Sequence, residues 1–103
     1  MKIFITGVAG FLGSHLADLM IANGHTVAGN DNMIGGYTDN VPQDVEFHQV
    51  DCCDLENLTK AMEGCDIVYH TAATAYEGLS VFSPVLVTRN IFEASVTTIT
   101  AAI

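Results

Sequence analysis

The chain has 103 residues, a length typical of one small domain, and half of them are hydrophobic, which excludes a disordered chain. The formal net charge is −9, with only three basic side chains, so the sequence predicts neither nucleic-acid binding nor attachment to an anionic membrane. No apolar run is long enough to cross a bilayer, and the N-terminus lacks the apolar core of a secretory signal.

The first part of the chain predicts a strand, a helix and a second strand. Residues 2–6 (KIFIT) are short, apolar and β-branched, as in a buried parallel strand. Residues 11–22 place their apolar side chains on one helical stripe, and Asn23-Gly24 supplies a stop signal. Residues 26–30 (TVAGN) then predict the second strand.

The middle of the chain predicts two more strands around a short helix. The stretch 32–44 carries two glycines, a proline and polar residues, which is typical of a loop. Residues 45–50 predict the third strand and residues 66–70 (DIVYH) the fourth. Between them, residues 54–62 are amphipathic, with Asp54 as the expected N-cap.

The last part of the chain predicts a loop and a long helix. We expect a loop over 71–83, followed by a helix over 84–103 with Ser83 as its cap and Pro84 in its first turn. The tail SVTTITAAI is rich in β-branched residues, so a strand there is the alternative.

This alternation of strands with helices or long loops indicates an α/β fold. It predicts one domain over residues 1–103, with a parallel sheet of about four strands and helices on both faces.

Three glycines stand three residues apart where the first strand turns into the first helix. The free N–H groups of a helix N-terminus, with its dipole, form a site for anions. Gly7 would make the tight turn, Gly10 would lie under a diphosphate, and Gly13 would let the helix pack closely on the strand. The sequence therefore predicts a backbone cradle for a diphosphate, held without help from a cation.

Asp31 follows the second strand, 18 residues after Gly13, close to the spacing of about 20 expected for a ribose-binding acid. Its carboxylate can accept hydrogen bonds from both ribose hydroxyls and would repel a 2′-phosphate. Because no Lys or Arg lies between Lys2 and Lys60, the sequence favours NAD over NADP. The alternative is that Asp31 is an ordinary solvated loop acid.

Five motifs, in order, carry a resemblance to the extended short-chain dehydrogenases/reductases, the NAD-dependent epimerase/dehydratase family. They are the glycine turn 6–14 (TGVAGFLGS), the pair Asp31-Asn32, the stretch 50–55 (VDCCDL), the strand and following residues 64–73 (GCDIVYHTAA), and Pro84 with Asn90. The match covers essentially the whole chain and is closest to the branch that acts on nucleotide-linked sugars.

The resemblance implies a Rossmann-type, doubly wound parallel sheet with NAD as its cofactor. In this family the first acid of the third motif and the next residue flank the adenine, and the residues after the fourth strand line the cofactor. Residues 74–82 would flank the nicotinamide and the sugar. The cofactor-binding residues that we predict are Gly7, Gly10, Phe11, Leu12, Gly13, Asp31, Asn32, Asp51, Cys52, Thr71, Ala72 and Ala73.

Two positions depart from the family pattern. Val50 stands where a glycine usually precedes Asp51, and Glu93 stands where a glycine usually follows Asn90 by three residues. A charged side chain at position 93 either disturbs close packing or faces solvent.

The family's catalytic Tyr-x-x-x-Lys pair is absent from this sequence. Four residues after Tyr37, Tyr69 and Tyr76 stand Val, Ala and Ser. We therefore interpret the chain as a truncated cofactor-binding half, without catalytic residues and without turnover of its own. It would meet a nucleotide sugar only where the missing half is present. A non-enzymatic dinucleotide sensor or accessory subunit is the alternative, and a purely structural oligomerisation module ranks last.

Two further expectations concern the environment of the chain. Helix 84–103 is apolar around most of its circumference, which predicts a homodimer through this helix, as in the family, or else poor solubility of a fragment. The chain has three cysteines and no CxxC, which favours reduced thiols in the cytoplasm. We expect these thiols to be small apolar core residues; the alternative is a metal site or a reactive thiol.

Overall fold

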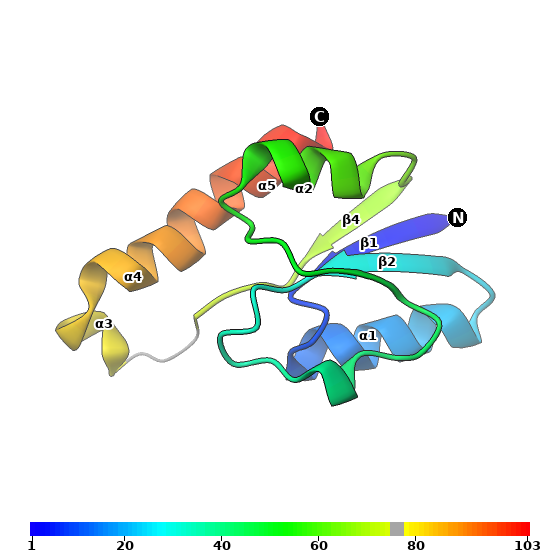
Figure 1. Ribbon diagram of the computed structural model, residues 1–103, viewed down its shortest axis with the longest axis horizontal. Coiled ribbons are helices and arrows are strands. Elements are labelled where there is room, and N and C mark those ends of the chain that lie inside the picture. Colours follow the sequence, from blue (N-terminus) through cyan, green and yellow to red (C-terminus); the bar gives the residue numbers. More distant parts are fainter. Residues whose placement is uncertain (75–77) are drawn as a thin grey trace.

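The computed structural model describes residues 1–74 and 78–103 and has a four-stranded parallel sheet at its centre (Figure 1). The strands lie in the order β3-β2-β1-β4, with β1 flanked on both sides. This arrangement confirms the parallel sheet expected from the sequence. The strands are β1 (Lys2–Thr6), β2 (Thr26–Asn30), β3 (Glu46–His48) and β4 (Ile67–His70).

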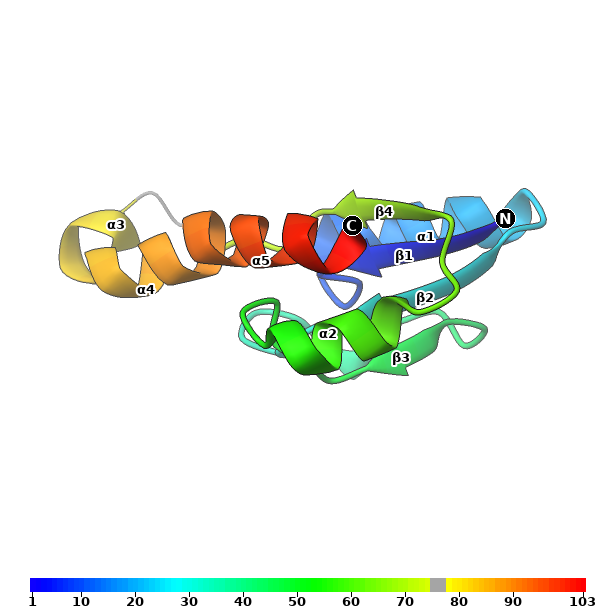
Figure 2. The same ribbon diagram turned by 90° about the horizontal axis from the view of Figure 1, so that it is seen from above.

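Helices cover both faces of the sheet, which makes it doubly wound. Helix α1 (Phe11–Ala22) lies on one face, and α2 (Leu55–Met62) and α5 (Ala94–Ala102) lie side by side on the other (Figures 1 and 2). Asp54 caps α2 as expected, because its carboxylate accepts the N–H of Asn57 at 3.2 Å.

The core has two layers, one on each side of β1. Ile3 and Ile5 point to the face covered by α1, where they pack with Val27. Phe4 points to the opposite face and packs with Leu58 of α2. A strand buried on both faces has a continuous apolar sequence, which is why KIFIT does not alternate with polar residues.

The third strand is shorter than the predicted range 45–50. Its register ends where Asn30 pairs with His48, because β2 ends at Asn30 and no partner remains beyond it. The Asp31 N–H adds a last hydrogen bond to the His48 carbonyl at 3.2 Å. The chain then leaves the sheet edge and turns toward the residues after β2.

The C-terminal segment is helical, so the alternative of a strand in the tail is wrong. Helix α4 (Pro84–Thr88) continues through a π-helical turn (Arg89–Glu93) into α5. Small residues at helical spacing, Ala94, Thr98 and Ala101, bury one face of α5 against the rest of the domain. This tertiary packing outweighs the β propensity of the tail.

One local expectation before this helix is wrong: the stretch 71–83 is not entirely a loop, because Leu79–Phe82 forms the short helix α3. Ser83 is the N-cap residue of α4 as expected, although its side chain makes no capping hydrogen bond, and Pro84 occupies the first turn. The predicted contacts of 74–82 with nicotinamide and sugar include residues 75–77, which lie outside the described residues.

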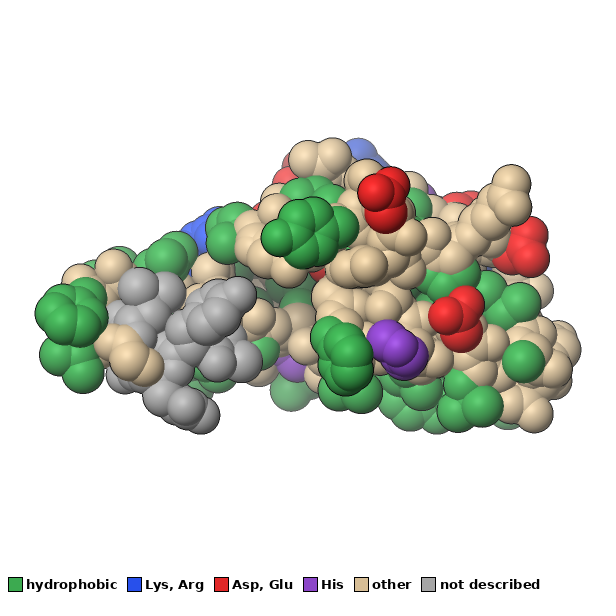
Figure 3. Space-filling view, turned by 90° about the horizontal axis from the view of Figure 1, so that it is seen from below, with side chains coloured by type: hydrophobic (Ala, Val, Ile, Leu, Met, Phe, Trp, Pro, Cys, Tyr) green, Lys and Arg blue, Asp and Glu red, His purple; other side chains and the backbone are tan. Residues whose placement is uncertain are grey.

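Hydrophobic side chains gather on the surface at the end of the molecule formed by α3 and α4 (Figure 3). Val81, Phe82 and Val85 are each more than three-quarters exposed, and Phe92 and Ile99 are more than half exposed. Within the described residues, no helix is long and apolar enough to cross a membrane.

Candidate dinucleotide-binding site

A cavity of about 350 Å³ opens at the carboxyl ends of β1, β2 and β4. In an open parallel sheet this edge is where ligands bind. All twelve residues singled out from the sequence line this cavity. They are Gly7, Gly10, Phe11, Leu12, Gly13, Asp31, Asn32, Asp51, Cys52, Thr71, Ala72 and Ala73.

The glycine turn leads from β1 into α1 at the floor of the cavity. Gly7 has a φ of +70°, and a Cβ there would lie 2.8 Å from the Ala72 Cα. A Cβ on Gly13 would overlap the Gly7 carbonyl, so this glycine lets α1 pack against the end of β1. Gly10 is less constrained, because the nearest described atom to its Cβ would be the Gly7 oxygen, at 3.2 Å.

Helix α1 presents a free N-terminus to the cavity. Its N-cap is Gly10, which supplies no side-chain acceptor, and its first turn carries no acid. The first N–H groups of a helix have no intrahelical acceptor, so those of Phe11 and Leu12 remain available at the cavity wall. This geometry fits the diphosphate cradle predicted from the sequence.

The Asp31 carboxylate is held in place at the cavity by two backbone donors. Its Oδ2 accepts the Ala9 N–H at 3.1 Å, and its Oδ1 accepts the Met33 N–H at 2.8 Å. Met33 takes a left-handed conformation, with φ +70°, to close this turn. A carboxylate has about four acceptor positions, so Asp31 keeps acceptors for a ligand.

The segment after Asn32 forms a wall over the glycine turn. Asn40 Nδ2 and the Tyr37 N–H both donate to the Ala9 carbonyl, each at 3.2 Å. A Cβ on Gly36 would lie 2.9 Å from the Ala9 Cβ, so only glycine allows this approach. The sequence predicted a loop here but not its contact with the glycine turn.

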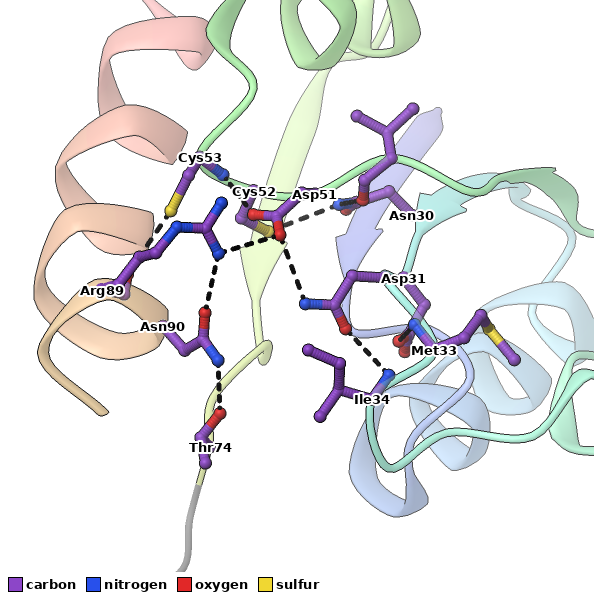
Figure 4. Close-up of polar contacts among 12 residues, drawn as sticks. Asn30, Asp31, Met33, Ile34, Asp51, Cys52, Cys53, Thr74, Arg89 and Asn90 are labelled. Atoms are coloured by element: carbon purple, nitrogen blue, oxygen red, sulfur yellow. Dashed lines mark hydrogen bonds and ion pairs between the residues drawn. The ribbon is translucent and has the colours of Figure 1, made fainter. Parts of the chain in front are cut away.

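Asp51 and Cys52 form the side of the cavity opposite α1 (Figure 4). Burial tends to raise the pKa of Asp51, but hydrogen bonds from the Cys53 N–H, Arg89 and Asn32 outweigh it, and the pKa lies below its ordinary value. Burial raises the pKa of the Cys52 thiol, which accepts the Asn30 amide at 3.3 Å. Cys52 is therefore a protonated, packed thiol, which agrees with the filler role.

The residues after β4 are fixed to the end of β1. The Thr6 hydroxyl accepts the N–H groups of Thr71 at 3.0 Å and Ala72 at 3.2 Å. The Thr71 hydroxyl donates back to the Thr6 carbonyl. These bonds hold the 71–73 segment close to Gly7 at the cavity.

The π turn explains how the chain accommodates Glu93 at the position where the family usually has a glycine. The Ala94 N–H bonds to the Arg89 carbonyl five residues earlier, so this turn of the helix holds one extra residue. Glu93 is exposed, while Asn90 and Ala94 are buried and line the cavity. A small residue thus faces the cavity one position later than the family pattern implies. Val50 is half-buried against the core, and its carbonyl accepts the Asn30 amide at 2.8 Å.

Sequence reasoning missed several residues of the cavity. Asn30, Ile34, Gly36, Thr74 and Ala94 line it, as does Asn90, which the sequence had marked only as a motif match. The sequence also gave no sign of the ion pair beside the cavity, in which Arg89 Nη1 lies 3.1 Å from Asp51 Oδ2. Asn30 could have been predicted to line the cavity, because it is the last residue of the second strand and directly precedes Asp31.

No group of three or more His, Cys, Asp or Glu side chains suited to a metal ion occurs within residues 1–74 and 78–103. Cys52, Cys53 and Cys65 are free thiols.

The doubly wound sheet and the glycine turn at its carboxyl edge define a Rossmann-type dinucleotide-binding domain. The model of the NAD dependent epimerase/dehydratase family matches residues 3–103, and the chain belongs to this family. The cofactor predicted from the sequence, NAD, is the cofactor of that family.

Individual relatives agree with this assignment. The chain is 34% identical over 84 residues to a UDP-glucose 4-epimerase of Corynebacterium glutamicum, covering 82% of this chain and 26% of the relative. A UDP-glucose 4-epimerase structure from Thermotoga maritima, with UDP-glucose, superposes with a TM-score of 0.95 and 30% identity over 99% of this chain and 34% of that one. A UDP-glucose 4-epimerase structure from Thermus thermophilus, in complex with NAD, superposes with a TM-score of 0.92 and 36% sequence identity. The superposition covers 98% of this chain and 33% of that one. The chain thus spans about a quarter to a third of the length of these relatives.

Proposed function

We propose that this chain is the NAD-binding domain of an NAD-dependent nucleotide-sugar epimerase or dehydratase. One observation carries the proposal: the glycine turn, the free N-terminus of α1 and the Asp31 carboxylate converge on one cavity. The family match and the UDP-glucose epimerases among the relatives support the substrate class.

The residues of the cavity fit the parts of NAD in order. The N–H groups at the start of α1 would hold the diphosphate, and Asp31 would accept the ribose hydroxyls. Asp51 and Cys52 would flank the adenine. The Thr71–Ala73 segment would lie toward the nicotinamide, the part of NAD that accepts and returns a hydride.

We propose that this chain by itself has no turnover. Hydride transfer in the family needs a tyrosine whose pKa is lowered from about 10 by a lysine four residues later. Val41, Ala73 and Ser80 occupy that position after the three tyrosines. A non-enzymatic dinucleotide sensor would use the same cavity, and both functions predict binding without hydride transfer. Nucleotide-sugar-dependent reduction of NAD by this chain would contradict both.

The exposed apolar side chains of the C-terminal helical segment support a homodimer. Val85, Phe92 and Ile99 are 81%, 69% and 62% exposed. Large apolar side chains exposed along one segment suit burial against a second copy of the chain. Sedimentation equilibrium tests the proposal: Phe92→Glu should turn a dimer into a monomer, whereas a monomeric unmodified chain would exclude it.

We propose a reducing, cytoplasmic location, because the sequence has an odd number of cysteines and no CxxC.

Calorimetric titration with NAD and NADP tests the cofactor assignment. We expect NAD to bind, and NADP to bind at least about tenfold more weakly because Asp31 repels the 2′-phosphate. Asp31→Asn should remove most of this preference. Asp18→Asn is the matched control, because Asp18 is exposed on α1 and outside the cavity. Equal binding of NAD and NADP by the unmodified chain would refute the role of Asp31.

A further inference from the structure

The Thr6 hydroxyl at the end of β1 has three polar partners. Its oxygen accepts the N–H groups of Thr71 at 3.0 Å and of Ala72 at 3.2 Å, and it lies 2.7 Å from Nδ1 of His70. Thr6 is fully buried, so bulk water does not replace any of these partners. This one hydroxyl therefore joins the last residue of β4 to the two residues that follow it.

The proton count at this hydroxyl assigns the tautomer of His70. A hydroxyl has one proton to donate and two lone pairs to accept with. Because two backbone N–H groups occupy the lone pairs, the Thr6 proton points to Nδ1, which carries no proton itself. Nε2 of the neutral ring then holds the proton and donates to the Ser95 hydroxyl at 3.1 Å. The Cys52 thiol also lies near Thr6, but it is a protonated thiol and a weak acceptor.

His70 can exchange protons with solvent, although its partner Thr6 is buried. β4 is an edge strand of the described sheet (Figure 1), and His70 is partly exposed there. β4 packs against β1, whose one charged side chain, Lys2, lies at the opposite end, and against α5, which has none. Tyr69, the titratable neighbour within the strand, is neutral below a pH of about 10. Burial alone lowers the pKa of His70.

Uptake of a proton by His70 is incompatible with this arrangement. A proton on Nδ1 makes the ring a donor at both nitrogens, so the Thr6 oxygen would face three donors with two lone pairs. Either the ring turns away and the buried Thr6 proton loses its acceptor, or the hydroxyl turns and one backbone N–H loses its acceptor. Each outcome breaks a hydrogen bond of a buried group.

These hydrogen bonds hold one wall of the cavity. Thr71 and Ala72 line the cavity, whereas Thr6 and His70 do not. The Ala72 Cα lies so close to the glycine turn that a Cβ on Gly7 would be 2.8 Å from it. A displacement of the 71–73 segment would therefore change the shape of the cavity beside the turn. His70 acts on this wall through Thr6 and not by direct contact.

We propose that His70 is a positioning residue whose neutral Nε2–H tautomer holds the 71–73 segment in place for dinucleotide binding, so that protonation of the ring weakens that binding. This inference rests on the proposed NAD-binding function. The net effect of one hydrogen bond corresponds to about a fivefold change in affinity. A direct attraction between an imidazolium and the diphosphate would have the opposite sign, so the direction of the pH effect distinguishes the two.

The experiment titrates the chain with NAD at pH ~7.5 and pH ~5.0, with circular dichroism to verify that the chain is folded at both. We expect the unmodified chain to bind NAD about fivefold more weakly at the lower pH. His25→Asn is the control, because His25 lies between α1 and β2 and outside the cavity, and it should keep this pH dependence.

Two variants of His70 separate positioning from simple packing. His70→Asn places its Oδ1 where Nδ1 stood and takes up no proton. It should bind NAD within about twofold of the unmodified chain at pH ~7.5 and lose the pH dependence. His70→Gln carries its amide one bond further out, so it should bind about fivefold more weakly at both pH values. If the ring only filled space, the two variants would weaken binding alike.

NMR tests the tautomer without any ligand. Long-range proton–nitrogen spectra of the imidazole rings at pH ~7.5 should show the His70 proton on Nε2 and none on Nδ1.

The outcomes separate this inference from the proposed function. If the unmodified chain does not bind NAD at pH ~7.5, the NAD-binding function is overturned and the role of His70 with it. If NAD binds but its affinity stays constant or rises on acidification, only the role of His70 is overturned. The same holds if His70→Asn keeps the pH dependence, or if the His70 proton lies on Nδ1.

Discussion

Replacing Gly13 by alanine tests the contact that positions α1 against the sheet. A Cβ at this position would overlap the Gly7 carbonyl oxygen and lie 2.8 Å from its carbonyl carbon. These atoms belong to a turn whose Gly7 N–H is bound to the Asn30 carbonyl at 2.8 Å, so they cannot move aside freely. Helix α1 must therefore shift away from β1.

The magnitude follows from two opposing terms. Alanine in place of a helical glycine gains about 1 kcal/mol, while overpacking against rigid atoms costs up to about 3 kcal/mol. We expect Gly13→Ala to lower the free energy of unfolding by about 2 kcal/mol, measured by urea denaturation followed by circular dichroism. Because α1 carries the cradle, NAD binding should weaken in the same variant.

Two other glycines provide the comparison. Among the described residues, no atom lies within 4 Å of a Cβ on Gly78, so Gly78→Ala should change stability by less than about 0.5 kcal/mol. Gly10→Ala should fall between the two, because its nearest contact is 3.2 Å. The close-packing argument is refuted if Gly13→Ala unfolds at the same urea concentration as Gly78→Ala.

Three further predictions concern the core, a helix cap and a histidine. Leu58→Ala should cost about 3 kcal/mol in urea unfolding because Leu58 is fully buried, whereas Leu55→Ala, at a 45% exposed site on the same helix, should cost less than about 1 kcal/mol. Asp54→Ala should cost about 1 kcal/mol by the same assay, since it removes the cap of α2; an unchanged midpoint would contradict the capping role. Burial lowers the pKa of His70 below its ordinary 6.5, so the unfolded chain takes up the proton more readily and stability should fall as the pH drops through that value. His70→Gln should lose this part of the pH dependence when melting temperatures are compared between pH ~7.5 and ~5.5, and an unchanged slope would exclude His70 as its source.

Local signals made much of the fold predictable. The apolar stretch 2–6, the helix over 11–22 and the Asp54 cap are specified by interactions among near neighbours, and the structure has all three. The predicted apolar stripe is not the buried face of that helix, because Phe11, Leu12 and Leu19 are more than half exposed. Its buried residues are the small Gly13, Ser14 and Ala17. The glycine spacing also located the cavity, because a strand, a turn and a helix form a continuous piece of chain. The limits of the third strand were not predictable, since the end of β2 decides where pairing stops.

The sequence, read with its resemblance to a known family, located twelve residues of the cavity, because the segments after strand ends meet at one edge of a parallel sheet. It did not indicate Asn30, Ile34, Thr74 or Ala94, which also line the cavity. The tertiary structure alone decided that Arg89 reaches Asp51, 38 residues earlier in the chain. It also decided that the π turn exposes Glu93 and buries Ala94. Both results depend on how α5 packs against α2 and the sheet, and contacts between segments distant in sequence leave no periodic pattern in the sequence itself.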